Sequence, residues 1–395
     1  MNSDSSRRNF LVAGLSLPVA GMANAPAPQA SAAKAAKTAS PGAAAAGYRM
    51  LGKTGLKVST VGYGCMITSD SSVISRAVDM GITYFDTARG YQSGNNERMV
   101  GAALKGSRDK IVLSTKSEAK TASEAVAQLD TSLKELGTDH VDIWYMHARD
   151  TVADIPDELV TVWENAKKQG KIRHIGISTH APLAIVDRVL AVNKFEVLLS
   201  TYNFTVGTGN DAAYKRLSDV GIGLVAMKVM APASRAKGFQ DIPGFRADRM
   251  DRVQKPGGPL AALKWVLRDK RFSTTIPSMT DIDQLEMNVR AMAEPFTAAD
   301  EKLLAGIGED IRPYYCRMCY QCSGQCPKGV RVPETIRYLS YADFYGQFAL
   351  GREHFMALPE EARAVRCRDC ASCQVRCPNG VHVAERLTRA QDLFA

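Results

Sequence analysis

Eight of the nine cysteines fall into two equally spaced runs in the last quarter of the chain. Each run reads C-x₂-C-x₂-C-x₃-C-P, and the residues are Cys316, Cys319, Cys322 and Cys326 before Pro327, then Cys367, Cys370, Cys373 and Cys377 before Pro378. Three thiolates two residues apart can reach three corners of one iron–sulfide cube, and the proline turns the chain away. The spacing therefore predicts metal ligation.

Zinc and disulfides are the alternatives. A zinc ion needs only four ligands and no third cysteine in each run, and disulfides between such close neighbours would close strained small loops. The runs resemble those of two-cluster bacterial ferredoxins, in which the fourth cysteine of each run ligates the other cluster. The resemblance implies one [4Fe-4S] cluster on Cys316, Cys319, Cys322 and Cys377, and a second on Cys367, Cys370, Cys373 and Cys326.

A second group of chemically capable residues follows short β-rich runs. Asp86, Lys116 and His147 each end or follow such a run, and Tyr91 lies just beyond Asp86. Each alone has a structural explanation. Asp86 could cap a turn and Lys116 could be a solvated strand end. His147 could be a core imidazole, and Tyr91 a packed loop residue. If parallel strands bring them to one edge, they form a proton-transfer group instead.

The elements that would position these residues alternate between strand and helix. The expected strands are Thr60–Tyr63, Thr83–Asp86, Ile111–Thr115, Val141–Met146, His174–Ser178, Val197–Tyr202, Gly223–Met227 and Thr274–Ile276, with helical patterns such as Ser123–Leu136, Asp157–Gln169 and Pro259–Asp269 between them. Eight strand–helix units predict an α/β fold, the (β/α)₈ TIM barrel, preceded by a small hairpin turning at Thr54-Gly55. An open doubly wound sheet is the alternative, but no GxGxxG follows the first strand.

The same positions carry a family resemblance. FDTARGYQSGNNERMVGAAL (85–104) resembles the aldo-keto reductase motif Asp-Thr-Ala-x-x-Tyr followed by Asn-Glu-x-x-x-Gly-x-Ala-Leu. The likeness continues through STK (114–116), YMH (145–147), GIS (176–178), STYN (200–203) and IPSM (276–279), and covers residues 48 to about 295. It implies a catalytic tetrad of Asp86, Tyr91, Lys116 and His147, with NADP or NAD across the barrel mouth.

The chemistry of carbonyl reduction fits that tetrad. Hydride addition leaves an alkoxide that must receive a proton, and the nicotinamide supplies the hydride. A phenol with a pKa near 10 is a slow donor, so a neighbouring cation is expected to ease release of its proton. The resemblance implies that Tyr91 is the acid, Lys116 the cation held by Asp86, and His147 the group that orients the substrate oxygen.

Cofactor contacts also follow from the resemblance. It implies that Gly64, Cys65 and Met66 line the nicotinamide ribose, that Ser178 contacts the carboxamide, and that Ser278, Gln284 and Asn288 lie at the adenosine end. The chain departs from the family at Thr179, where an Asn is usual, and at Ser200, where a Gln is usual. Ser278 and Gln284 replace the Lys and Arg that hold a 2′-phosphate in many members. Because a dianionic phosphate favours charged partners, both NADP and NAD stay open.

The N-terminus reads as an export signal. Arg7 and Arg8 precede an apolar run and an Ala-x-Ala triplet, and SRRNFL (6–11) resembles the twin-arginine signal of bacteria. A frayed basic terminus is the alternative. Residues 1–25 are thus the expected signal peptide, and 26–47 an Ala/Pro-rich linker that lacks the large apolar side chains needed for folding. Because clusters are assembled in a reducing compartment, a cluster protein must be exported already folded, which predicts a periplasmic or otherwise exported protein.

Composition and residue patterns indicate the remaining domains and exclude some kinds of partner. Residues 48–310 form the expected barrel, and 311–395 a mainly α-helical, dicluster ferredoxin-like domain whose segment between the cysteine runs, 332–365, reads helical. No run is long and apolar enough for a membrane span after signal removal, and no basic block suggests nucleic acid.

We expect an exported reductase of a small carbonyl or alcohol, with a redox protein as candidate partner. The alternatives are an electron-transfer or nucleotide-binding protein whose barrel does not turn over, and clusters that only stabilise the C-terminus.

Overall fold

The centre of the protein is a ring of eight parallel strands. The computed structural model describes residues 47–206, 209–230, 242, 253 and 257–395, so the expected signal (1–25) and all of the expected linker except Gly47 lie outside the described residues. The strands are β3 (Tyr63–Gly64), β4 (Tyr84–Asp86), β5 (Val112–Ser117), β6 (Val141–Met146), β7 (Ile172–Thr179), β8 (Val197–Thr201), β9 (Gly223–Met227) and β10 (Phe272–Thr275). Neighbours in the chain pair in parallel, and bridges from Val61 to Thr275 and from Gly64 to Ser278 nearly close the ring. The predicted (β/α)₈ barrel is confirmed.

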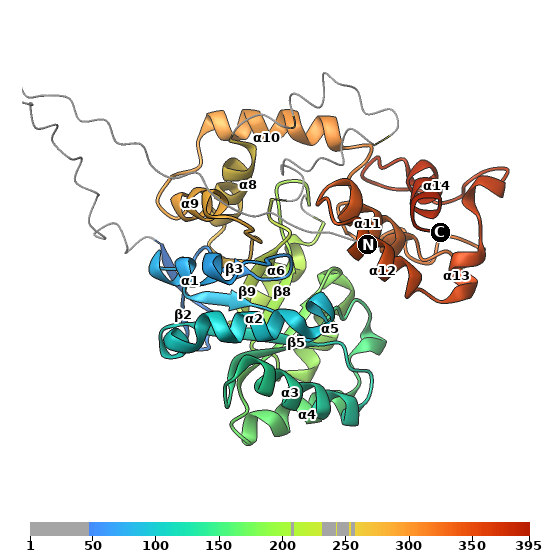
Figure 1. The fold of residues 1–395 in the computed structure, drawn as a ribbon. Helices are drawn as coiled ribbons and strands as arrows, with labels where there is room; N and C mark the ends of the chain where they lie inside the picture. Colours follow the sequence, from blue (N-terminus) through green and yellow to red (C-terminus); the bar gives the residue numbers. More distant parts are fainter. Residues whose placement is uncertain (1–46, 207–208, 231–241, 243–252, 254–256) are drawn as a thin grey trace, which may run out of the picture. The chain divides into compact units, whose positions relative to one another are not determined.

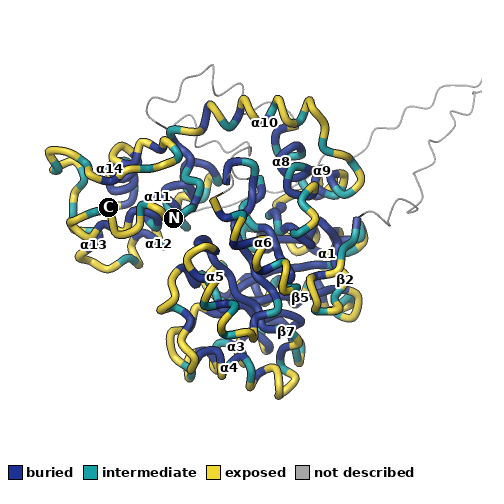
Figure 2. Tube along the Cα trace, turned by 180° about the vertical axis from the view of Figure 1, so that it is seen from behind, coloured by how far each residue is buried: buried dark blue, intermediate teal, exposed yellow. Residues whose placement is uncertain are grey.

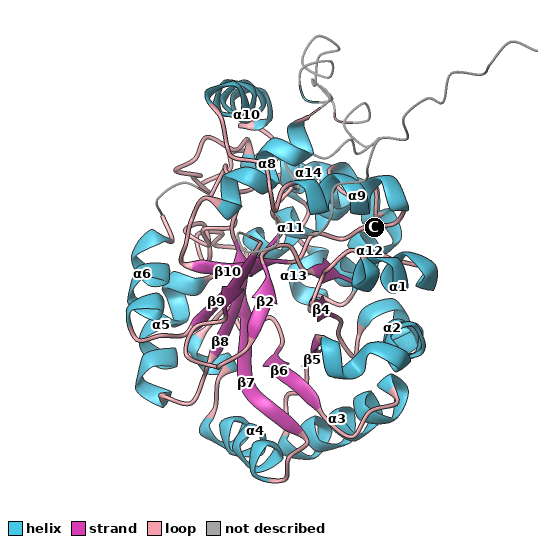
Figure 3. Cartoon of the chain, turned by 90° about the vertical axis from the view of Figure 1, so that its left-hand side faces the viewer, coloured by secondary structure: helices cyan, strands magenta, loops and turns pink. Residues whose placement is uncertain are grey.

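Helices surround these strands (Figure 3). They are α1 (Ser71–Asp79), α2 (Asn95–Leu104), α3 (Ala122–Leu136), α4 (Asp157–Lys168), α5 (Pro182–Val192), α6 (Asp211–Asp219), α8 (Gly258–Leu267) and α9 (Ile282–Arg290), followed by α10 (Ala298–Ile311). Short turns are η1 (Tyr91–Gly94), η2 (Lys105–Lys110) and η3 (Val152–Asp154). Local sequence sets the helix ends: Thr121 and Glu124 form a capping box before α3, and Gly137 ends it in a left-handed conformation, φ +64°.

A two-stranded hairpin precedes the barrel, as expected from the sequence. Strands β1 (Tyr48–Met50) and β2 (Lys57–Ser59) pair antiparallel, and Gly55 in the turn has φ +78°. Leu51 and Val58 pack with inward-facing side chains of the barrel strands, including Tyr145. Hydrophobic burial therefore fixes the hairpin against the interior of the ring.

The C-terminal segment is helical. Its helices are α11 (Val332–Asp343), α12 (Phe348–Met356), α13 (Glu360–Ala364) and α14 (Val383–Phe394), with the turn η6 (Cys367–Asp369) (Figure 1). The fully buried Asp343 of α11 pairs with Arg386 and Arg389 of α14. Residues 43–395 form one compact unit, and Figure 2 shows buried residues along the barrel strands and the C-terminal helices. None of the described helices has the length and apolar character to cross a bilayer.

Candidate active site and cysteine centres

The barrel brings the four predicted tetrad residues to the carboxyl ends of three adjacent strands. Asp86 is the last residue of β4, Lys116 the penultimate residue of β5, and His147 the first residue after β6. Tyr91 opens the turn η1 that follows β4. In a TIM barrel these ends form the catalytic mouth, so the observed geometry matches the place where the chemistry is expected.

Lys116 is the hub of this group. Its Nζ lies 2.5 Å from Asp86 Oδ2, 2.7 Å from the Thr87 carbonyl oxygen and 3.1 Å from Tyr91 Oη. Lys116 and Asp86 are each only 1% exposed. The charged pair beside the phenol is therefore shielded from water. The Ser114 hydroxyl donates to the other oxygen of Asp86 at 2.7 Å, which fixes the carboxylate.

The electrostatics of Tyr91 differ from the expectation based on sequence. Burial raises the pKa of Tyr91 to about 12, although Lys116 acts in the opposite direction. Burial also disfavours the charge on Lys116, but Asp86 and Tyr91 outweigh it and raise the pKa of that amine. Lys116 therefore stays charged and Tyr91 stays protonated at neutral pH. Because an alkoxide is a stronger base than a phenolate, the phenol can still protonate it.

His147 completes the mouth beside Tyr91. The two rings meet edge to face with centroids 5.9 Å apart. Nδ1 of His147 lies 3.0 Å from Oε1 of Glu118, and the imidazole is the main reason that the pKa of Glu118 is lowered to about 2. The sequence reading missed Glu118, although it lies only two residues beyond Lys116. The Glu118 carboxylate thus lies at the Nδ1 edge of the imidazole, at the mouth of the barrel.

The family model for the aldo/keto reductase family matches residues 68–309. The chain belongs to the aldo/keto reductase family. Its similar relatives include the uncharacterized oxidoreductase YqkF of Bacillus subtilis, 26% identical over 276 residues that cover 62% of this chain and 90% of that protein. Another is the L-glyceraldehyde 3-phosphate reductase of Escherichia coli O157:H7, 25% identical over 323 residues, covering 67% and 92%. Among solved structures, aldo-keto reductase AKR11C1 from Bacillus halodurans in its holo form is similar at 27% identity and TM-score 0.57, covering 66% and 95%.

Within the aldo-keto reductase barrel, the four residues expected near the nicotinamide differ in their contacts. Gly64 approaches β10 so closely that a Cβ would sit 2.6 Å from the Ile276 carbonyl oxygen. The Cys65 thiol is fully buried in the core, and the Cys65 carbonyl accepts from Asn96 Nδ2 at 2.8 Å. The Met66 carbonyl accepts from Gln92 at 3.3 Å. The Ser178 hydroxyl accepts from the backbone N–H of Ala148 at 2.8 Å and so braces the loop after His147.

One of the three residues expected at the adenosine end has a side-chain amide without a hydrogen-bond partner among the described residues. Ser278 bridges to Gly64 in the backbone, and Gln284 Nε2 donates to Thr280 Oγ1 at 2.9 Å. Asn288 on α9 is fully buried, yet neither its Nδ2 nor its Oδ1 has a partner among the described residues. A buried amide without partners costs about 1–3 kcal/mol. Asn288 therefore fits a nucleotide base edge, which offers both a donor and an acceptor.

The eight clustered cysteines are all free thiols. Asn379, two residues past Cys377, donates to Cys319 Sγ at 3.4 Å, and the backbone N–H of Arg376 donates to Gln325 Oε1 at 2.8 Å. Both contacts join the second cysteine run to the first. Burial raises the pKa of the Cys316 thiol to about 12, and Cys319 and Cys377 act on it as close neighbours. The neighbours of Cys367 are instead Cys326, Cys370 and Cys373.

The neighbours of Cys322 are Cys316, Cys319 and Cys377. The thiols thus form two quartets with the composition that the crossed pattern predicts. Six of the eight pack around a small apolar core that includes Val332 and Leu387. In the part of the chain that the structure describes, no three His, Cys, Asp or Glu side chains converge on a single metal ion. The two iron–sulfur clusters stay a prediction.

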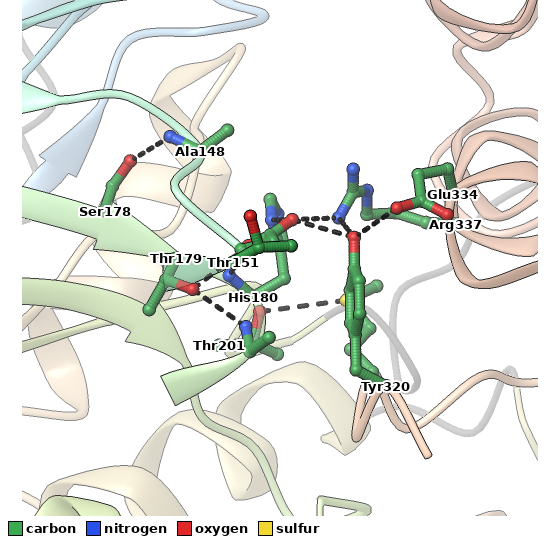
Figure 4. Close-up of polar contacts among 12 residues, drawn as sticks. Ala148, Thr151, Ser178, Thr179, His180, Thr201, Tyr320, Glu334 and Arg337 are labelled. Carbon is green, nitrogen blue, oxygen red and sulfur yellow. Dashed lines mark hydrogen bonds and ion pairs between the residues drawn. The ribbon is translucent and has the colours of Figure 1, made fainter. Parts of the chain in front are cut away.

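A buried polar network joins the C-terminal segment to the barrel. Asp150, three residues past His147, accepts from the His180 backbone N–H at 2.7 Å and from Thr179 Oγ1 at 3.0 Å. Its Oδ2 lies 2.9 Å from both Arg337 Nη1 and Tyr320 Oη. Figure 4 shows Arg337 and Tyr320 reaching toward the side of the barrel that carries Thr179 and His180. The segment with the cysteines is therefore anchored to the loops of the catalytic mouth.

Sequence reasoning identified none of this network. Thr179 was noted only as a departure from the family's usual Asn, and the structure gives it a use as a donor to Asp150. Ser200, the other departure, lies 3.3 Å from the hydroxyl of Tyr214 in the core. Asp150 and Arg337 are 187 residues apart, and no local pattern in the sequence connects them.

Proposed function

We propose that the protein is a nicotinamide-dependent reductase of a small carbonyl compound, or the corresponding alcohol dehydrogenase. The observation that carries the proposal is the buried amine of Lys116, in contact with both Asp86 Oδ2 and Tyr91 Oη. A nicotinamide bound at the mouth would supply the hydride. The unpartnered amide of Asn288 supports a nucleotide at the adenosine end.

The side chains divide the remaining work. Tyr91 donates its proton to the developing alkoxide, and the positive charge of Lys116, 3.1 Å from Oη, stabilises the phenolate left behind. Asp86 keeps Lys116 charged and in place. His147, held by Glu118, orients the carbonyl oxygen beside Tyr91. Each step uses groups that are already in position, so little reorganisation is needed during the reaction.

We also propose that the two cysteine quartets hold [4Fe-4S] clusters that exchange single electrons with a redox partner. Support comes from the crossed contacts between the runs. Met318, between Cys316 and Cys319, is buried with its sulfur 3.7 Å from Thr201 Oγ1 at the end of β8. The quartet of Cys316, Cys319, Cys322 and Cys377 would then be the one nearer the barrel. The alternative is that the clusters only stabilise the C-terminal segment.

Export through the twin-arginine route is the third proposal. It rests on the SRRNFL signal together with eight cysteines kept as thiols. Loading the thiols before export protects them from pairing in an oxidising compartment. Periplasmic fractions of the source cells should contain the iron-loaded protein, and variants in which both arginines of the signal are Lys should remain inside.

The decisive test of the catalytic proposal is Tyr91→Phe. With NADPH or NADH and a neutral aromatic aldehyde, we expect carbonyl reduction to fall by at least about 100-fold, the lower end of what a general acid contributes. Nucleotide affinity and iron content should stay unchanged. Tyr48→Phe is the matched control, because that hydroxyl donates only to the Gly81 carbonyl, away from the mouth. Equal activity in Tyr91→Phe and wild type would refute the assignment.

A further inference from the structure

Lys228 is a partly buried amine at the mouth of the barrel. It directly follows β9 and has the left-handed backbone angle φ +58°, which is uncommon for a residue with a side chain. The fully buried Asn203 holds this conformation by donating to the Lys228 carbonyl at 3.1 Å. Strained backbone that is held in place in this manner is often associated with function. It directs Lys228 toward the C-terminal helices.

The partners of the Lys228 amine are aromatic. Nζ lies 3.4 Å from Tyr341 Oη and over the Tyr341 and Tyr345 rings, 4.6 and 5.4 Å from their centroids. Burial, assisted by Arg337, lowers the pKa of Lys228 to about 7. A buried ammonium without a counter-ion is costly. Aromatic faces compensate only in part.

Two carboxylates at the mouth of the barrel already have partners. Asp150 pairs with Arg337 at 2.9 Å, and Glu118 pairs with His147 at 3.0 Å. Among the described residues, Lys228 has no ion pair. An anionic ligand could therefore pair with its amine.

Tyr341 of α11 brings the C-terminal segment to the mouth of the barrel. Its hydroxyl contacts the amine of Lys228, which directly follows β9 at the carboxyl end of the strands, the end that also carries Tyr91. Its ring also packs against His354 of α12 at 5.7 Å. An anion bound by the Lys228 amine and the Tyr341 hydroxyl would therefore lie at the same barrel mouth as Tyr91.

We propose that Lys228 and Tyr341 form a subsite for a carboxylate or phosphate carried by the carbonyl substrate, so that the enzyme acts on anionic carbonyl compounds. The proposal rests on the proposed function. It gives the C-terminal segment a role in substrate binding, since α11 supplies one of the two donors. The diphosphate of the nucleotide is the other anion that could occupy the subsite, and the experiment separates the two.

The test compares 4-carboxybenzaldehyde with its neutral analogue methyl 4-formylbenzoate in wild type, Lys228→Met and Lys228→Arg. We expect Lys228→Met to raise KM for the charged aldehyde at least tenfold and to leave the neutral ester within about twofold. Lys228→Arg should retain most of the preference for charge. Lys215→Met, an exposed residue of α6, is the matched control. An equal change for both aldehydes, or no change, would overturn the subsite.

Binding measurements keep this result independent of turnover. Calorimetry with benzoate and benzamide on nucleotide-loaded protein should show that benzoate alone loses at least tenfold in affinity in Lys228→Met. If wild type reduces neither aldehyde but shows this selective loss, the reductase proposal fails and the anion subsite stands. If Lys228→Met instead weakens NADPH or NADH and leaves benzoate unchanged, the amine serves the nucleotide and the substrate subsite is refuted.

Discussion

Replacing Arg337 with Met should loosen the attachment of the C-terminal segment to the barrel. The guanidinium lies 2.9 Å from Asp150 Oδ2, and the two side chains are 7% and 9% exposed. Methionine keeps much of the length and apolar contact of arginine but removes its charge. The variant would leave the Asp150 carboxylate buried without its cation, while His180, Thr179 and Tyr320 stay within hydrogen-bond distance of it.

The size of the effect follows from the geometry. Two opposite charges at this separation attract by about 6 kcal/mol at an effective dielectric constant of about 20. Part of this is offset because the guanidinium no longer has to be desolvated. Breaking one side of a buried pair typically costs about 3–5 kcal/mol. We expect the lower end, about 3 kcal/mol, because three groups that can donate to Asp150 remain.

Hydrogen exchange read by mass spectrometry on the loaded protein measures this loosening locally. A loss of about 3 kcal/mol should speed exchange in α11 and in residues 147–151 by about 100-fold. Arg352→Met is the matched control, because Arg352 is exposed on the neighbouring α12, and it should leave both segments unchanged. Exchange in α11 within about threefold of wild type in Arg337→Met would show that the ion pair does not anchor the segment.

Two further outcomes test the cysteine quartets and the nucleotide site. Protein purified without air should contain about eight irons per chain, and the EPR spectrum left in Cys326→Ser should match that of Cys367→Ser and differ from that of Cys319→Ser. A match to Cys319→Ser would contradict the crossed arrangement. Asn288→Leu should raise the melting temperature of the nucleotide-free protein, because it removes an unpartnered buried amide worth about 1–3 kcal/mol. It should also weaken nucleotide binding at least tenfold, and unchanged affinity would exclude Asn288 from the site.

The barrel could be predicted from sequence because each strand–helix unit is specified locally. Alternation of β-rich runs with amphipathic segments gave Val141–Met146 and Gly223–Met227 with the bounds that the structure has. The first strand was less exact: β3 spans only Tyr63–Gly64, and Val61 makes an isolated bridge to Thr275. The sequence predicts that strand at 60–63, which begins three residues and ends one residue before β3, because nothing local shows where the closing strand approaches.

Sequence alone determined the residue types and spacings that carry the chemistry: the polar residues at strand ends and the paired cysteine runs. These depend on short-range order, since a strand end and a loop a few residues away must be neighbours in space. Only the tertiary structure decided how much the site is buried, which raises the pKa of Tyr91 where sequence reasoning favoured easier proton release. It also decided which distant groups meet, Lys228 with Tyr341 and Asp150 with Arg337. Such contacts depend on how helices far along the chain pack over the barrel mouth, and that information is spread over the whole core.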